Sequence, residues 1–229
     1  VPDWPALPLR YVDYACWQRD YLAGAQSAAA RARWVERMTP LPEPLKLPID
    51  RPRPARRSQR GEVLRFTFDA ARLRGLKARA RACGVTLFPA LLALVKTLLY
   101  RHTGQSDVVV GVPVAERDHE SLQGLVGFLV NTLPLRDRLQ VDAGFDRLVT
   151  DIGASLRAAL EDQRHPLEAL VSDLNVPREA TRNPLFDVLV ALEDPDWRGS
   201  ISSDALRMSP YPLRQRQSKM DLSFFFREE

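Results

Sequence analysis

The side chains that could carry nucleophilic or acid–base chemistry are few in this sequence. Histidine occurs only at His102, His119 and His165, and cysteine only at Cys16 and Cys83. A nucleophile needs a general base within hydrogen-bonding reach, and none of the three histidines lies in a paired or motif-like setting. We therefore predict no catalytic residue in this chain, and the sequence leaves open whether it acts as an enzyme.

Each of these five side chains has a structural interpretation. We expect His102, which follows an apolar helix, to interact with the C-terminal dipole of that helix, and His119 and His165 to be solvated. Cys16 and Cys83 have no neighbours at metal-ligand spacing, so we predict buried thiols and no metal site. The glycines do not form a phosphate-binding fingerprint, and we expect no directly bound cofactor.

Composition excludes several classes of protein. The 229 residues include 33 Lys and Arg against 29 Asp and Glu, a net charge of +4, and 45% are hydrophobic, which supports a folded core. Like charges do not cluster into a stripe for nucleic acid. The longest apolar stretch, residues 87–100, is interrupted by Pro89 and Lys96 and is shorter than the roughly 20 residues that span a bilayer.

These observations predict neither a nucleic-acid partner nor a membrane partner, and they favour a cytoplasmic location. Because the first residue is Val1, we expect the sequence to be part of a longer one.

The N-terminal part of the chain divides into a helical segment and a connector. Residues 11–38 are strong helix formers and predict one or two helices, with Gly24 as a possible break. Residues 39–60 hold six of the 18 prolines, which excludes regular helix or a central strand and predicts an extended connector.

The remaining residues, 61–229, predict an α/β core. Alternation of Leu64, Phe66 and Phe68 predicts a strand over residues 62–69. A helix is expected from 70 to 83, and a buried helix with Thr86 as its N-cap is expected to follow. Further strands are predicted at 107–114, 128–135, 185–192 and 220–227, and further helices at 145–163 and 167–174. This mixture predicts an α/β sandwich in which helices cover a mixed sheet.

Four short phrases occur in a characteristic order, at residues 11–18, 126–132, 163–168 and 178–185. Their order resembles the condensation domain of nonribosomal peptide synthetases, with its phrases Y-x-D-Y-A-x-W-Q, V-G-x-F-V-N-T, Q-D-x-P-F-E and R-x-x-S-R-N-P-L. The chain departs from these phrases at Leu129, Arg164, Leu167 and Thr181. Only Arg164 reverses a charge.

The family's H-H-x-x-x-D-G phrase, whose second histidine positions or deprotonates the acceptor amine, is absent. The chain therefore resembles the C-terminal lobe alone. The resemblance implies a half-domain with the chloramphenicol-acetyltransferase-like fold over residues 1–229. Its parts are a helical entry at 1–38, the connector at 39–60 and the α/β core at 61–229.

The resemblance also implies a function. In the family, an amide bond forms between an acyl or peptidyl donor and an aminoacyl acceptor, each tethered through 4'-phosphopantetheine to a carrier protein. The implied partners are the N-terminal lobe, the donor and acceptor carrier proteins and an adenylation domain. This fragment would line the substrate tunnel and be inactive alone. The alternative is a non-catalytic condensation-like module that recruits a carrier protein or a partner enzyme.

The resemblance suggests which residues line the tunnel and the seam between lobes. Gly127, Asn131 and Thr132 are the candidate tunnel residues, although Asn131 and Thr132 could instead bond neighbouring backbone. Arg136 could reach an aspartate of the other lobe, or be a plain surface arginine.

Two further groups of residues have open interpretations. Tyr14 and Trp17 could lie at the base of the seam between the two lobes, or belong to the core. Arginines of the connector could contact a carrier protein or simply be solvated; they are Arg51, Arg53, Arg56, Arg57 and Arg60.

Overall fold

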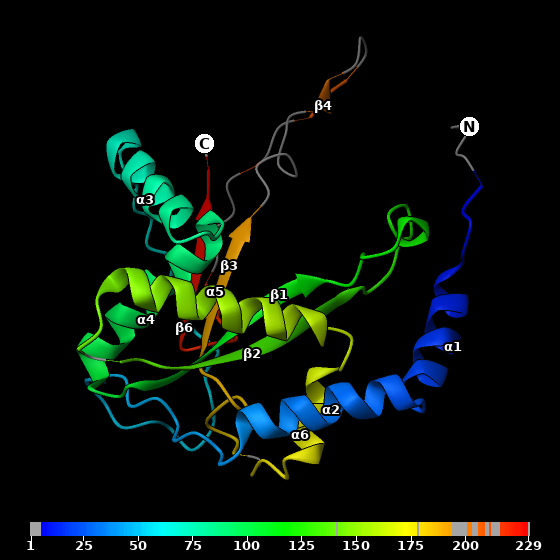
Figure 1. Cartoon of the computed structure of the whole chain (residues 1–229), viewed down its shortest axis with the longest axis horizontal. Coiled ribbons are helices and arrows are strands. Elements are labelled where there is room, and N and C mark those ends of the chain that lie inside the picture. The colour runs from blue at the N-terminus through cyan, green and yellow to red at the C-terminus, as the bar shows by residue number, and fades with distance from the viewer. Residues whose placement is uncertain are drawn as a thin grey trace.

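A four-stranded mixed sheet organises the computed structural model, which describes residues 6–140, 142–177, 179–193, 201–202, 206–208, 211 and 216–228. The strand order is β2-β1-β3-β6, and a separate two-stranded ribbon is formed by β4 and β5 (Figure 1). The strands are β1 (Asp107–Ala115), β2 (Val130–Arg138), β3 (Val188–Glu193), β4 (Ile201–Ser202), β5 (Arg207–Met208) and β6 (Leu222–Arg227).

The register of the sheet places β1 in its interior. β1 pairs antiparallel with β2 along its whole length, from Asp107 opposite Arg138 to Ala115 opposite Val130, and β3 pairs parallel with both β1 and β6. The valine-rich run of β1 is buried on both faces, as a central strand covered by other elements requires.

Helices surround this sheet, and their bounds are α1 (Tyr11–Leu22), α2 (Ala25–Met38), α3 (Ala70–Ala82), α4 (Leu87–Thr103), α5 (Phe145–Glu161) and α6 (Leu167–Asp173). α4 and α5 pack on each other and on the sheet, whereas α3 packs on α4 (Figure 1). A mixed sheet flanked by helices confirms the predicted fold class.

α4 is the buried helix that the sequence predicts. It begins after Thr86, as expected, although the Thr86 side chain makes no capping hydrogen bond. Gly104 ends it with φ of 70°, in the left-handed region that glycine adopts without strain. Within the described residues, no single helix is long and apolar enough to cross a bilayer; α3 and α4 pass that test only as a pair bent by 106°.

The apolar side chains of the described residues form a large core and a small one. The large one lies between the sheet and helices α2, α4 and α5, and it also takes in Leu45 of the proline-rich segment. The small one joins Tyr14 of α1 to three leucines that follow β1, Leu122, Leu125 and Leu129. A one-turn 3-10 helix, η1 (Glu120–Leu122), lies in the connection that bears these leucines.

The predicted strand at residues 62–69 is wrong. These residues are extended but belong to no strand, and Leu64 and Phe66 are 77% and 84% exposed. The alternating pattern is suitable for a strand, but a strand also needs a ladder partner, and among the described residues none pairs with this segment. Residues 39–60 contain no helix and only one isolated bridge, between Arg60 and Gln217.

The other expected elements are present with shifted ends. Residues 11–38 form two helices that separate at Gly24. β2 begins two residues later than predicted and ends three later, and β3 begins at Val188 instead of residue 185. Arg178, the first residue of the fourth family-like phrase, lies outside the described residues.

Candidate functional site

α1 presents an aromatic face to the connection between β1 and β2. Tyr14 is buried there, and its hydroxyl donates a 2.7 Å hydrogen bond to Glu116 Oε2. Burial, with this hydrogen bond, raises the pKa of Tyr14, and burial also raises the pKa of Glu116. Tyr14 is therefore part of the small core, which is one of the two positions considered for it.

Trp17 remains on the surface of the same helix. Its ring stacks on Tyr21 with centroids 5.4 Å apart, and the Arg164 guanidinium lies 5.2 Å from its centroid. Arg164 also donates a 2.6 Å hydrogen bond to Asp118. Arg164, where the charge differs from that of the family phrase, thus links α1 to the segment after β1.

Gly127 lies in the turn that precedes β2, directly against the ring of Tyr11. Its neighbours Val126 and Phe128 project into solvent, with 86% and 76% of their surface exposed. This turn is the most exposed apolar part of the predicted tunnel segment, and it contains no titratable side chain.

Asn131 makes four hydrogen bonds to backbone. Its amide nitrogen donates to the carbonyls of Gln163 and His165, at 2.7 and 2.9 Å, and its oxygen accepts from the amides of Thr132 and Leu167. All amide hydrogen-bonding positions of a buried side chain are satisfied in this way. The geometry matches the predicted alternative in which Asn131 bonds neighbouring backbone.

Replacing Asn131 with leucine is expected to lower the free energy of unfolding by about 2 kcal/mol, because backbone groups of the segment before α6 lose their partners. Urea unfolding followed by circular dichroism measures this. Thr132→Val is the matched control on the same strand and should change stability by less than about 1 kcal/mol. Equal effects of the two substitutions would contradict the role given to Asn131.

Arg136 is committed to contacts within the chain. Its guanidinium donates to both carboxylate oxygens of Asp107, at 2.9 and 2.7 Å, and also to the carbonyls of Arg37 and Pro40. The side chain is only 6% exposed. Arg136 is therefore not a plain surface arginine, and the ion pair that it makes within this chain is with Asp107.

The connector arginines fall into two groups. Arg53 makes a bidentate ion pair with Asp221, and Arg57 donates to the carbonyl of Lys219. Arg51 and Arg56 are exposed, as is Arg60. Arg53 therefore ties the connector to the segment before β6, whereas Arg51 and Arg56 are accessible.

Two predictions about single side chains are wrong. Cys16 is exposed, because α1 covers the small core with its Tyr14 face and leaves the Cys16 face to solvent; Cys83 is partly buried.

His165 is buried beside Asp173, with Nε2 3.4 Å from Oδ2, and the Asn131 amide holds its backbone carbonyl. Burial lowers the pKa of His165. His119 is exposed as predicted.

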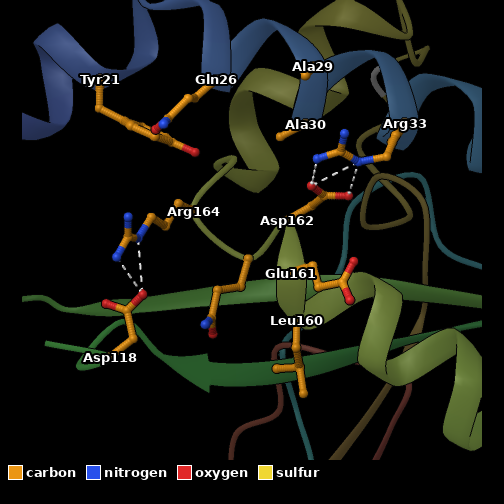
Figure 2. Close-up of a pocket in the computed structure, with 11 residues that line it drawn as sticks. Tyr21, Gln26, Ala29, Ala30, Arg33, Asp118, Leu160, Glu161, Asp162 and Arg164 are labelled. Carbon is orange, nitrogen blue, oxygen red and sulfur yellow. Dashed lines mark hydrogen bonds and ion pairs between the residues drawn. The ribbon is translucent and has the colours of Figure 1, made fainter.

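A pocket of about 360 Å³ lies between α1, α2 and the C-terminal end of α5. Figure 2 shows two charged pairs in it, Arg164 with Asp118 and Arg33 with Asp162, and it shows Glu161 outside these pairs. The four paired groups neutralise one another, and Glu161 is a lining carboxylate outside these pairs. Within the described residues, no group of His, Cys, Asp and Glu side chains is arranged to hold a metal ion.

The residues around α1 therefore combine an aromatic helix face, an exposed apolar turn and hydrogen-bonded polar groups. The family model of the condensation domain matches residues 2–229, nearly the whole chain. The chain belongs to the condensation-domain family.

Curated relatives of this condensation-domain chain are large synthases. It is 38% identical to isonitrile lipopeptide synthase of Mycobacterium tuberculosis in an alignment that covers 100% of this chain and 9% of that protein. It is 34% identical to tyrocidine synthase 3 of Brevibacillus parabrevis, over 98% of this chain and 4% of that protein. The chain thus spans a small part of the relatives it matches.

Solved structures show the same fold. The X-domain from teicoplanin biosynthesis superposes with a TM-score of 0.91 at 24% identity, over 100% of this chain and 52% of that one. The condensation domain of the monacolin K polyketide synthase MokA gives a TM-score of 0.75 at 24% identity, over 86% of this chain and 48% of that one. The chain corresponds to a C-terminal portion of the condensation domain.

Several residues that build this condensation-domain surface were not identified from the sequence. Tyr11 lies within the first family-like phrase, but the sequence does not reveal that it contacts Gly127, which is 116 positions away. Glu116 and Asp118 have the sequence context of a solvated charged loop. The available signal was that Glu116 closely follows a predicted strand and that Tyr14 lies on the apolar face of a predicted helix, where its hydroxyl needs a partner.

Proposed function

We propose that this chain forms one wall of the substrate tunnel in a condensation domain of a nonribosomal peptide synthetase. That domain joins a carrier-tethered acyl or peptidyl donor to a carrier-tethered aminoacyl acceptor through an amide bond. The observation that carries the proposal is the family match over residues 2–229, together with the lipopeptide synthase among the relatives. Those relatives give no support to the alternative of a non-catalytic recruiting module.

Amide formation depends mainly on how the two tethered substrates are positioned. The acceptor amine attacks the donor thioester carbonyl, the C–N bond forms, the C–S bond breaks, and the thiol departs on the donor's phosphopantetheine arm. Holding amine and carbonyl within attack distance supplies most of the required acceleration. In this proposal the chain orients the tethered substrates and excludes water. In the family, the histidine that positions or deprotonates the amine belongs to the H-H-x-x-x-D-G phrase, which this sequence does not contain.

The proposal includes partners of defined kinds. The N-terminal lobe supplies the opposite wall, two carrier proteins deliver substrates, and an adenylation domain is the neighbour in a cytoplasmic synthetase. Arg51 and Arg56 are the accessible connector arginines that would meet the carrier surface or its phosphate. We propose neither a nucleic-acid nor a membrane partner.

The test is amide formation from two loaded carrier proteins. This chain alone is expected to give no product, because the base is absent, whereas the whole condensation domain that contains it should give product detected by mass spectrometry. A reaction without the donor carrier is the control. Product from the chain alone, or a whole domain that binds both carriers without forming amide, would contradict the proposal.

A further inference from the structure

We propose that His165 makes the contact between α6 and α2 sensitive to pH, because protonation of its buried ring brings it into competition with Arg31 for the carboxylate of Asp173. The inference goes beyond the proposed function and does not depend on it, since it concerns how these elements are held together. It assigns a role to a buried titratable side chain that amide formation does not use.

His165 lies in the segment that joins α5 to α6, and two hydrogen bonds fix its backbone. Its amide donates to the Asp162 carbonyl at 3.1 Å, and its carbonyl accepts from Asn131 Nδ2 of β2 at 2.9 Å. The side chain is only 4% exposed. α6, which follows, packs on α2 and β2. The ring therefore cannot reach water unless the segment that Asn131 holds also moves.

The ring faces a carboxylate that already has a partner. Asp173 Oδ1 lies 2.7 Å from Arg31 Nη2, and this ion pair joins the last residue of α6 to α2. Asp173 Oδ2 lies 3.4 Å from His165 Nε2. Among the described residues, neither this oxygen nor either ring nitrogen has a hydrogen-bond partner. A protonated ring has two N–H donors to satisfy, and Asp173 Oδ2 is the acceptor beside it.

The surroundings of the ring favour its neutral form. The charged side chains around it are Arg31 of α2, Asp173 of α6, and Asp162 just after α5, the last of which is held by Arg33 and Arg37 of α2. Burial has the largest effect and lowers the pKa of His165, and Arg31 lowers it further; the two carboxylates oppose this shift but do not cancel it. The ring is therefore neutral near pH 7 in the folded chain.

Acidification is expected to weaken the contact of α6 with α2. A folded-state pKa below the unfolded value of about 6.5 means that the unfolded chain binds the proton more readily. The stability that depends on neutral His165 is therefore complete above about pH 6.5 and is lost as the pH falls through the folded value. The proton places a second cation beside the pair of Arg31 and Asp173, which is the contact that ties α6 to α2.

The test is urea unfolding of the full chain, followed by circular dichroism at pH 7.5 and at pH 5.5. Between these values the ratio of folded to unfolded chain should fall about fivefold more in the unaltered chain than in His165→Gln, because glutamine does not titrate. Each variant is compared with itself at the two pH values, so a general loss of stability in His165→Gln does not affect the result.

Substitutions of the two partners should act in opposite directions. Arg31→Met removes the competing cation and should reduce the pH-dependent fall to about twofold, whereas Asp173→Asn removes the nearest carboxylate and should increase it to about tenfold. Both substitutions break the same ion pair, so a purely structural role of that pair predicts equal effects. Asp151→Asn, in the exposed pair with Arg147, is the matched control and should leave the fall unchanged.

Proton NMR of the full chain reports the titration directly. The ring resonance that disappears in His165→Gln should titrate with a midpoint below 6.5 in the unaltered chain. A midpoint at or above 6.5, an equal pH-dependent fall in the unaltered chain and in His165→Gln, or equal effects of the two partner substitutions would each overturn the inference. Amide formation by the whole domain enters none of these measurements, so the proposed function is tested separately.

Discussion

Replacing Asp137 with alanine is expected to lower the free energy of unfolding by about 4 kcal/mol. Asp137 is the carboxylate bonded to Lys96, whose side chain is 0% exposed, and Lys96 Nζ lies 2.5 Å from Asp137 Oδ2. The ammonium also donates to the carbonyls of Val108 and Leu135, at 3.2 and 2.7 Å. Without the carboxylate, a positive charge is left in an apolar core.

The ion pair has this large effect because of where it lies. Lys96 projects from the middle of α4, and the two carbonyls that it meets belong to β1 and β2. A charge that loses its partner there cannot reach water without moving the helix from the sheet. Urea unfolding followed by circular dichroism at pH 7 measures the loss.

A double variant and an exposed pair are the controls for Asp137. Lys96→Met combined with Asp137→Leu removes both charges and should regain most of the lost stability. Asp151→Ala breaks the exposed pair with Arg147 and should cost less than about 0.5 kcal/mol. If the double variant is no more stable than Asp137→Ala, the buried charge is not the cause.

Replacing Asp162 with alanine is the second large effect, with an expected loss of about 3 kcal/mol and a fall in Tm of about 10 °C. The Asp162 side chain is 0% exposed and accepts from Arg33 at 2.5 Å and from Arg37 at 2.7 Å. Its carbonyl accepts from Trp34 Nε1 at 3.0 Å. The residue therefore joins α2 to the end of α5, and differential scanning calorimetry measures its loss.

The pH dependence of this contribution has a definite sign. Burial opposes ionisation of Asp162, but hydrogen bonds from Arg33 and Arg37 outweigh it and hold the pKa of the carboxyl below its ordinary value. A lowered folded-state pKa stabilises the protein above the unfolded value of about 3.9, and the benefit is lost as pH falls through the folded value. The stability difference between the unaltered chain and Asp162→Asn should be constant from about pH 7 to pH 5 and shrink below about pH 4.

The exposed pair of Arg19 and Asp20, on α1, provides the comparison. Asp20→Ala should change Tm by about 2 °C or less at any of these pH values. A stability difference for Asp162→Asn that grows as the pH falls would contradict the assigned ion pairs.

Much of the local structure could be predicted from the sequence. The apolar pattern of residues 87–99 predicts a buried helix, and the valine run of β1 predicts a buried strand. The structure confirms both, and the helix ends at Gly104. The ordered phrases indicated the family, and the family model matches the chain.

The predicted strand at 62–69 shows where local pattern is insufficient. Alternation states which side chains would share a face, but a strand forms only when another backbone accepts its hydrogen bonds. The same limit applies to Asn131, whose amide could face a ligand or the backbone, and whose four partners lie partly in residues 163–167.

Sequence alone thus determined most element types, the buried helix and the family, because each is encoded by residues close together along the chain. The tertiary structure decided that Arg136 pairs with Asp107, that His165 is buried and that Tyr11 lies on Gly127. Partners as much as 116 positions apart meet only when the sheet order and helix packing are set, so no spacing in the chain encodes their contact.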